Sequence, residues 1–368
     1  MPRRFGLLWA LAAFAALAGG SPAVVMAGAL GLPHLPPPPA AQVELGRKLF
    51  FDRRLSVNGT LSCAMCHVPA QGFTANELRT SVGMEGVSLR RNAPTLLNVA
   101  FVRPLFVDGR APSLEAQALM PFVHPDELAN ANIAAAMRRI DATGEYRAPM
   151  RAAFGAERAT PARVASALAA YQRSLIAADT PFDRWRFGGQ RDALDVSAQR
   201  GFALFQSLGC VVCHTVDTKH AWFSDGQFHN VGTQARSEAR RSRPVQVQLV
   251  PGQVTELTPQ ELRRIGVDDV TDHGRHEVTR LPRDLRAYRT PSLRNVALTA
   301  PYMHDGSLDT LDDVLDHYSV GGTPSDPAQD PRIRPISLDA AQRADLIAFL
   351  QSLTSPEAVR LGKVSPIP

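Results

Sequence analysis

The amino-acid sequence predicts a mainly α-helical protein made of two similar domains related by internal duplication. Its 368 residues are too many for one small core and suit two domains of ordinary size. One cysteine and histidine motif occurs twice, and the segment 93–114 aligns without a gap on the segment 290–311. We therefore expect domains over 28–185 and 186–368, preceded by a targeting segment over 1–27.

The targeting segment has the pattern of a secretory signal. Arg3 and Arg4 precede an apolar run over 5–18, and the small residues around Ala27 suit cleavage there. An uncleaved anchor would share the same first half, so both interpretations remain open. No later stretch is apolar and long enough to span a bilayer. The prediction is an exported, periplasmic protein that makes no membrane contact once the signal is removed.

The charge of the chain does not indicate nucleic-acid binding. The formal net charge is +5, and it falls to about +3 without the two arginines of the signal, which contains no acid. One polar segment, predicted to be a loop, is locally basic through Arg236, Arg240, Arg241 and Arg243. A solvated surface is the favoured interpretation of this segment, and a docking patch for an acidic partner is the alternative.

All four cysteines lie in two copies of the pattern Cys-x-x-Cys-His. The copies are "CAMCH" and "CVVCH", with Cys63, Cys66 and His67 in the first and Cys210, Cys213 and His214 in the second. This is the attachment signature of c-type haem, in which two thiols bind the porphyrin and the histidine reaches the iron. A redox Cys-x-x-Cys or half a zinc site would explain one copy. Two copies that use every cysteine predict two covalent haems.

The segments around each motif predict helices. "ELGRKLFFD" precedes the first motif and "AQRGFALFQ" precedes the second. In each segment a glycine, Gly46 or Gly201, stands three residues before a Leu-Phe pair. We therefore expect one helix face to lie against each haem. Thr160 and Pro161 suit the start of a helix over "ARVASALAAYQRSLIA". "LDAAQRADLIAFLQSL" predicts another amphipathic helix. The fold class is therefore two cytochrome c-like helical domains.

The internal repeat assigns a different ligand environment to each haem. Its two copies are 197 positions apart, and the same register places Pro121 opposite Tyr318. Proline cannot bind iron, whereas a tyrosine oxygen can, so we expect an open first haem and a second haem closed by Tyr318. The alternative is a packed tyrosine with a hydrogen-bonded hydroxyl. The neighbouring His317 is expected beside the haem ligands or at the surface.

The motifs together resemble a known family, the bacterial di-haem cytochrome c peroxidases and their MauG-type relatives. Besides the two haem motifs, the resemblance rests on "RRNAPTLLNVAF", "DGRAPSLEAQALMPF", "FHNVG", "TPSLRNVALTAPYMHDG" and the C-terminal helix. It covers nearly all of the mature chain. These motifs are specific for the superfamily and do not select one activity within it.

The resemblance implies roles for individual residues. The first haem would be the peroxidatic one, with His67 as proximal ligand and with Gln117, Pro121 and Glu127 on its open face. Glu127 would move a proton between the peroxide oxygens; without the resemblance it would be an ordinary carboxylate at a helix start. The family also implies a calcium ion between the haems, and its ligands here would be Asn92, Thr299 and Pro301.

The chain departs from the family pattern at three positions. Tyr318 stands where typical peroxidases have methionine on the electron-entry haem, as in MauG-type enzymes, and it predicts a low haem potential. Met84 stands where peroxidases have a switchable histidine, and it is either a weak ligand or a packing residue. Val107, which the repeat pairs with His304, stands where both branches usually have a tryptophan between the haems.

The sequence therefore predicts an exported di-haem oxidoreductase that reacts with hydrogen peroxide at the first haem and relays electrons through the second. A small cytochrome c or cupredoxin as donor would make it a peroxidase. A protein substrate would make it a MauG-like oxidase. A non-catalytic electron carrier with both irons fully ligated is the third interpretation, and Pro121 and Glu127 argue against it. In the insertion over 234–280, His273 and His276 are expected to be loop residues rather than ligands.

Overall fold

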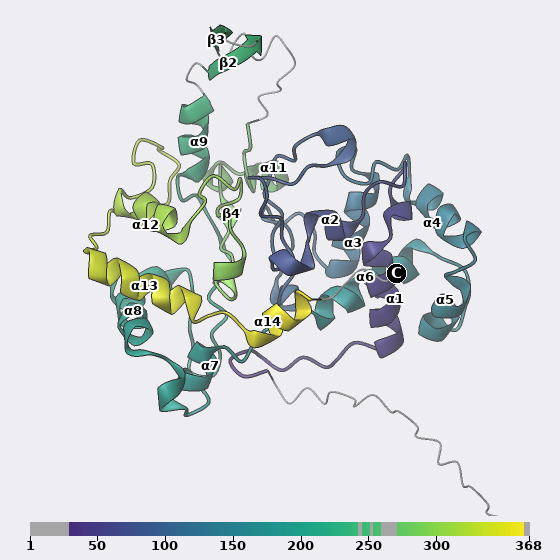
Figure 1. Ribbon diagram of the computed structural model, residues 1–368, viewed down its shortest axis with the longest axis horizontal. Helices are drawn as coiled ribbons and strands as arrows, with labels where there is room; N and C mark the ends of the chain where they lie inside the picture. The colour runs from purple at the N-terminus through teal and green to yellow at the C-terminus, as the bar shows by residue number, and fades with distance from the viewer. Residues whose placement is uncertain (1–28, 242–244, 251–252, 259–270, 364–368) are drawn as a thin grey trace, which may run out of the picture.

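The computed structural model describes residues 29–241, 245–250, 253–258 and 271–363, so the predicted signal over 1–27 lies outside it. The fold is mainly helical, with two groups of helices side by side (Figure 1). In the first half the helices are α1 (Ala40–Phe51), α2 (Cys63–Cys66), α3 (Leu114–Val123), α4 (Ile133–Ala142), α5 (Arg147–Phe154), α6 (Pro161–Ser174) and α7 (Pro181–Arg186). In the second half they are α8 (Val196–Ser207), α9 (Thr233–Arg241), α11 (His276–Thr279), α12 (Leu311–Ser319), α13 (Ala340–Gln351) and α14 (Pro356–Leu361). Within the described ranges, none of these helices has the length and apolar character needed to cross a bilayer.

Each half is built on a close crossing of two helices at a glycine. A Cβ atom on Gly46 of α1 would lie 1.9 Å from the Ala167 carbonyl oxygen of α6, and one on Gly201 of α8 would lie 1.9 Å from the Asp345 carbonyl oxygen of α13. Only glycine permits this approach. The glycine of each helix therefore packs against the crossing helix.

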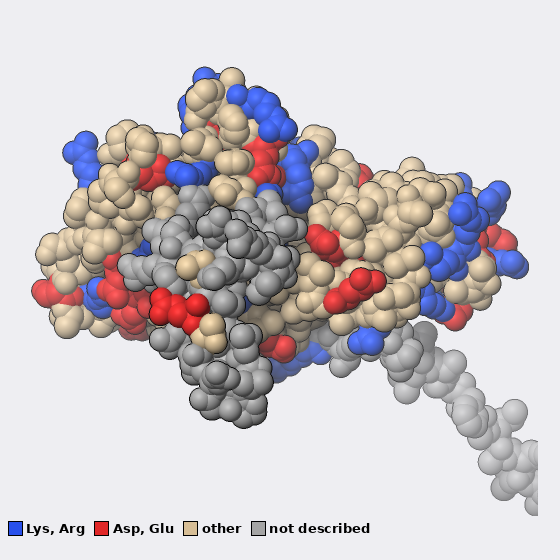
Figure 2. Space-filling model, turned by 90° about the horizontal axis from the view of Figure 1, so that it is seen from above, with Lys and Arg blue, Asp and Glu red and all other residues tan. Residues whose placement is uncertain are grey.

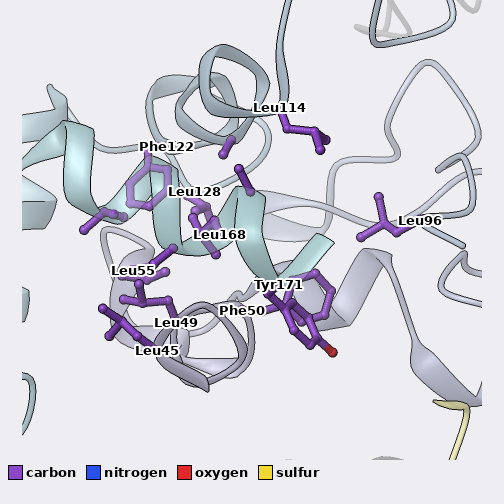
Figure 3. Close-up of a cluster of buried hydrophobic side chains, with 14 of the residues drawn as sticks. Leu45, Leu49, Phe50, Leu55, Leu96, Leu114, Phe122, Leu128, Leu168 and Tyr171 are labelled. Carbon is purple, nitrogen blue, oxygen red and sulfur yellow. The ribbon is translucent and has the colours of Figure 1, made fainter. Parts of the chain in front are cut away.

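The two halves have separate hydrophobic cores of different character. The first is largely aliphatic and includes Leu45, Leu49, Leu55 and Leu168, with the rings of Phe50 and Tyr171 beside each other (Figure 3). The second is an aromatic cluster, whose main members are Phe182, Phe202, Phe205, Phe223 and Phe349. Neighbouring rings in it have centroids 5.0–6.1 Å apart, mostly edge to face, a favourable arrangement for aromatic rings.

Two asparagines 197 positions apart make equivalent contacts. Asn98 and Asn295 are both left-handed, with φ of 60° and 62°. The Asn98 N–H donates to the Leu175 carbonyl, just after α6, at 2.7 Å. The Asn295 N–H donates to the Leu353 carbonyl, just after α13, at 2.9 Å. Both side chains also donate to the Ala177 carbonyl oxygen, at 2.8 and 3.4 Å. The ends of α6 and α13 are thus fastened in the same way.

The chain termini cross between the halves. Near the N-terminus, the Gly31 carbonyl accepts hydrogen bonds from the Arg294 side chain at 2.7 Å and from the Ala221 N–H at 3.0 Å, both in the second half. At the C-terminus, Ala358 of α14 is buried in the first core. Helix α7 extends across the predicted boundary at 185, and its Phe182 packs in the second core. Each half therefore depends on a piece of the other.

The insertion over 234–280 contains regular structure that the sequence did not indicate. The basic segment predicted to be a loop lies mostly in helix α9 (Figure 1). Strands β2 (Val245–Val250) and β3 (Gln253–Leu257) form an antiparallel hairpin beyond it. A second small sheet pairs β1 (Phe228–His229) with β4 (Tyr288–Arg289). His276 begins α11, and its Nδ1 lies 2.9 Å from the Leu281 carbonyl oxygen, while His273 is in the preceding loop.

Candidate haem sites

The first Cys-x-x-Cys-His motif forms a short helix that points its histidine into the first half. Cys63 and Cys66 begin and end α2, and His67 follows it with Nδ1 3.1 Å from the Phe73 carbonyl oxygen. This contact fixes the ring and leaves Nε2 as the atom able to bind a metal. Burial lowers the pKa of His67 and so favours the neutral imidazole, which is the form that ligates iron.

The second motif is organised in the same way. Cys210 begins a 3₁₀ turn (Cys210–Val212), and the His214 Nδ1 lies 2.9 Å from the Phe223 carbonyl oxygen. Burial lowers the pKa of His214 and raises the pKa of the Cys210 thiol to about 11, just as it raises that of Cys63 to about 12. The four cysteines form no disulfide. Neutral histidines with one oriented nitrogen, each beside two free thiols, fit covalently attached haems.

Helices α3 and α12 occupy equivalent places in the two halves. Ser113 caps α3 by accepting a hydrogen bond from the Ala116 N–H, and Thr310 caps α12 in a capping box with Asp313. Pro121 and Tyr318 both stand eight residues after these caps, in the last turn of their helices. The structure thus brings the two residues that the repeat pairs to matching positions.

Tyr318 is buried beside the second Cys-x-x-Cys-His motif. It lies near the thiols of Cys210 and Cys213, and burial raises the pKa of its phenol. Its hydroxyl makes no hydrogen bond within the described part of the chain, whereas the hydroxyl of Tyr302 donates to the Val296 carbonyl oxygen at 3.2 Å. A ferric ion facing this oxygen would stabilise the phenolate and supply the missing partner.

His317 is buried behind Tyr318 rather than exposed. Its Nε2 lies 2.8 Å from the Val231 carbonyl oxygen, and its ring meets that of Tyr318 edge to face at a centroid distance of 5.5 Å. Of the two positions the sequence allowed, the surface one is therefore wrong. His317 fastens the end of α12 to the segment after β1 and supports the Tyr318 ring.

Of the residues expected on the open face of the first haem, Gln117 and Pro121 lie on α3 and Glu127 lies near the first motif. The Gln117 side-chain oxygen is buried with no hydrogen-bond partner among the described residues, and Gln117 precedes Pro121 by one helical turn. Glu127 is in a turn after α3. Its carboxylate is close enough to the Cys63 and Cys66 thiols to contribute to their raised pKa. Burial raises the pKa of Glu127, and the nearby His124, at 3.9 Å, only partly opposes this.

Met84 is a packing residue in this structure. It is 6 % exposed in the first core, and its sulfur accepts a hydrogen bond from Asn58 Nδ2 at 3.2 Å. Met84 lines a cavity of about 570 Å³ together with Pro125 and Asp126. This cavity opens beside the turn that carries Glu127.

The expected calcium ligands lie between the halves. Asn92 Nδ2 donates to the Pro301 carbonyl oxygen at 2.7 Å, and Asn92 Oδ1 is buried without a partner in the described ranges. Thr299 is two residues before Pro301, and its hydroxyl donates to the Val296 carbonyl oxygen. An unpartnered amide oxygen beside a backbone carbonyl suits a hard cation such as calcium.

One cluster near the second motif resembles a metal site in composition. Cys213, Asp225 and His229 bring their ligand atoms within 4.8 Å of one another. Asp225 and Asp330 each lie 2.9 Å from one nitrogen of the His229 ring. The Cys213 side chain, and after it Asp225, raises the pKa of His229 to about 9. Because Cys213 belongs to the haem motif, we interpret this cluster as part of the surroundings of that motif and not as a separate metal site. The sequence indicated His229 only through "FHNVG".

Known proteins resemble the chain in sequence and in fold. The family described as di-haem cytochrome c peroxidase matches residues 40–192. The methylamine utilization protein MauG of Methylorubrum extorquens is 38% identical over 88% of this chain and 81% of its own. Cytochrome-c peroxidase IdrP1 of Denitromonas iodatirespirans is 35% identical over 89% of this chain and 86% of its own. The chain belongs to the di-haem cytochrome c peroxidase and MauG superfamily.

A solved structure agrees with this membership. The crystal structure of a MauG-like protein associated with microbial copper homeostasis superposes with a TM-score of 0.70 and 32% identity, over 89% of this chain and 96% of that one. As a member of this di-haem superfamily, the chain is an oxidoreductase, and the family implies two c-type haems.

At the position where the superfamily usually has a tryptophan, the carbonyl of Val107 accepts a hydrogen bond from the Arg289 N–H at 2.7 Å.

Proposed function

We propose that the protein reacts with hydrogen peroxide in its first half and passes electrons through its second half. The observation that carries this proposal is the difference between Pro121 and Tyr318 at equivalent positions of α3 and α12. A bound haem supplies a redox-active iron. Pro121 offers no atom to iron and would leave the first haem open to peroxide, while the Tyr318 oxygen would be a ligand of the second haem.

Glu127 and Gln117 would prepare peroxide for cleavage. The raised pKa of Glu127 suits a group that takes a proton from one peroxide oxygen and returns it to the other. The unpartnered oxygen of Gln117 would accept a hydrogen bond from the peroxide and so orient it. The cavity beside Met84 and Asp126 supports an approach from that side of the first half.

The second half would store or relay oxidising equivalents. An anionic oxygen from Tyr318 favours ferric and higher oxidation states over ferrous iron. A Tyr318 ligand would therefore give the second haem a low potential.

The electron source distinguishes two activities. A small donor protein, a cytochrome c or a cupredoxin, would make the protein a peroxidase, which is our leading proposal. A protein substrate would make it a MauG-like oxidase, and Tyr318 is the observation that favours this second candidate.

Lys and Arg are interspersed with Asp and Glu over the face shown in Figure 2. This mixed surface favours a donor that docks through a small contact rather than through one large field of charge.

Three further expectations complete the proposal. The segment 1–27 would direct export to the periplasm, where haem proteins of this type meet their donors. Domains over 28–185 and 186–368 would each hold one haem. Asn92, with the carbonyl oxygens of Thr299 and Pro301, would bind one calcium ion between them.

The test uses the purified haem-loaded protein. We expect a resting ferric spectrum with one high-spin and one low-spin haem, and a spectral change on adding one equivalent of hydrogen peroxide. Steady consumption of peroxide with a reduced cytochrome c or cupredoxin would identify a peroxidase. A reaction with peroxide but no turnover with either donor would instead favour the oxidase. Two low-spin haems that do not respond to peroxide would overturn the proposal.

A further inference from the structure

Two reciprocal hydrogen bonds join the halves. The Asn92 N–H donates to the His304 carbonyl oxygen at 2.7 Å, and the Arg289 N–H donates to the Val107 carbonyl oxygen at 2.7 Å. Asn92 and Arg289 are 197 positions apart, and so are Val107 and His304. Asn92 and Arg289 therefore occupy equivalent places at the boundary between the halves.

The side chains of Asn92 and Arg289 suit ligands of opposite charge. Asn92 presents a buried amide oxygen without a partner in the described chain, which suits a cation. Arg289 is itself a cation. Its Nε donates to the Phe106 carbonyl oxygen at 3.3 Å, and desolvation lowers the pKa of its guanidinium to about 10. Where the first half offers an oxygen atom to a cation, the second half carries a cation of its own.

Arg289 differs from the other arginines at this boundary because no carboxylate of the described residues pairs with it. Arg91 lies 2.5 Å from Asp108 and 2.6 Å from Asp272. The other arginines at the boundary also have carboxylates within 4.0 Å, and these arginines are Arg79, Arg90, Arg110 and Arg275. A guanidinium that is largely removed from water is costly unless an anion accompanies it. Arg289 therefore calls for an anion other than the carboxylates of the described residues.

The position of Arg289 indicates which anion this is. Arg289 is two residues before Pro291, whose carbonyl group faces the ring of His214. Its own backbone contacts Val107, in the loop before α3. Arg289 thus stands beside the second haem motif and touches the half that holds the first. Each haem carries two carboxylates, and a guanidinium pairs with a carboxylate through two parallel hydrogen bonds.

We propose that the guanidinium of Arg289 binds a carboxylate of a haem and acts as a tethered cation at the place equivalent to the candidate calcium site. The proposal rests on haem attachment and not on peroxide chemistry. It assigns Arg289 a role in holding the prosthetic group and in setting its potential, because a fixed positive charge near a haem favours the reduced state.

The first test is the crystal structure of the haem-loaded wild-type protein. We expect at least one Arg289 guanidinium nitrogen within about 3.2 Å of a haem carboxylate oxygen, a normal hydrogen-bond distance. A separation beyond about 4 Å from every haem carboxylate would overturn the proposal. This test needs no variant and no peroxide, so its result is independent of the catalytic proposal.

The second test measures reduction potentials of both haems in three variants. Arg289→Gln removes the charge, and we expect the ferric-to-ferrous ratio of at least one haem to rise about tenfold at a fixed electrode potential, which is 59 mV for a one-electron couple. Arg289→Lys keeps the charge and should stay within about threefold of wild type. Arg275→Gln is the matched control, since Arg275 lies at the same boundary but has Asp284 at 3.9 Å. Unchanged potentials in Arg289→Gln, or an equal shift in the control, would contradict the proposal.

Discussion

Helices α3 and α12 begin with the same kind of cap and end with different chemistry. Both start at a hydroxyl residue that accepts a backbone hydrogen bond, and both carry the paired residue in their last turn. At that position α3 has Pro121, which offers no donor atom, and α12 has Tyr318, which offers an oxygen. In our proposal, this one difference separates a reactive site from a closed one.

The most severe way to break this comparison is to remove one haem at a time. Cys63→Ala with Cys66→Ala should abolish the reaction with hydrogen peroxide, because the open site is lost. Cys210→Ala with Cys213→Ala is the matched pair, and it should retain the initial reaction with one equivalent of peroxide while losing steady turnover. Stopped-flow absorbance and haem content measure both. If reactivity survived the first pair and vanished with the second, the roles of the halves would be reversed.

The proton-transfer role of Glu127 is the next largest expected effect. Glu127→Gln keeps the size of the side chain but cannot carry the proton, so the rate of reaction with peroxide should fall by about 10²-fold or more. Asp126→Asn is the control, since it removes the adjacent carboxylate. An equal loss in both variants would indicate a general electrostatic effect, and no loss in Glu127→Gln would make this residue an ordinary carboxylate.

Tyr318→Phe removes the donor oxygen of the second half and keeps the ring. The second haem should become high-spin or take another ligand, and its potential should rise by on the order of 0.1 V, within the span of about 0.8 V that axial ligands cover. Tyr302→Phe is the control, because its hydroxyl donates to a backbone carbonyl oxygen instead. Spectra and potentials unchanged by Tyr318→Phe would make Tyr318 a packed aromatic.

The pH dependence of the peroxide reaction sharpens the assignment of Glu127. The pKa of this carboxyl is raised by burial, so its basic form is lost at a higher pH than in an exposed glutamate. On acidification the rate should therefore fall several-fold, beginning above the usual glutamate range of about 4.3. Glu127→Gln should lack this limb of the pH–rate profile. The same limb in the variant would assign it to another group.

The smallest expected effect concerns the scaffold that the halves share. Gly46→Ala and Gly201→Ala each place a Cβ atom against a carbonyl oxygen of the crossing helix, so each should lower the free energy of unfolding by about 1–3 kcal/mol. Gln206→Ala, on the exposed face of α8, should change it by less than about 0.5 kcal/mol. Denaturant unfolding measures all three. A loss confined to one glycine would show that the two crossings are not energetically equivalent.

The sequence predicted the pairings that depend on register and missed those that depend on loop geometry. The 197-residue offset was enough to place Pro121 opposite Tyr318, because both lie in helices of fixed pitch. The carbonyl groups that hold His67 and His214 belong to Phe73 and Phe223, six and nine residues further along the chain. Such backbone contacts depend on the path of irregular segments. These segments have no repeating residue pattern from which their path could be predicted.

Other misses have the same physical origin. The sequence did not predict that the glycines of α1 and α8 pack against crossing helices, because a helix face can be assigned to a neighbour only when the crossing is known. It allowed His317 to be exposed, although the carbonyl group of Val231 binds it from a distant segment. Charge counting could not distinguish Arg289 from the paired arginines, because pairing depends on which carboxylates the fold brings near.

The exchanged termini affect the order in which the protein can be assembled. Ala358 of α14 packs in the first core, while Gly31 of the N-terminal segment is bound by Arg294 of the second half. A ribosome delivers residue 31 long before its partner exists. The packing of the first half is therefore complete only after α14 has been added, and neither half reaches its final packing alone. Once closed, the two halves should melt in a single cooperative transition.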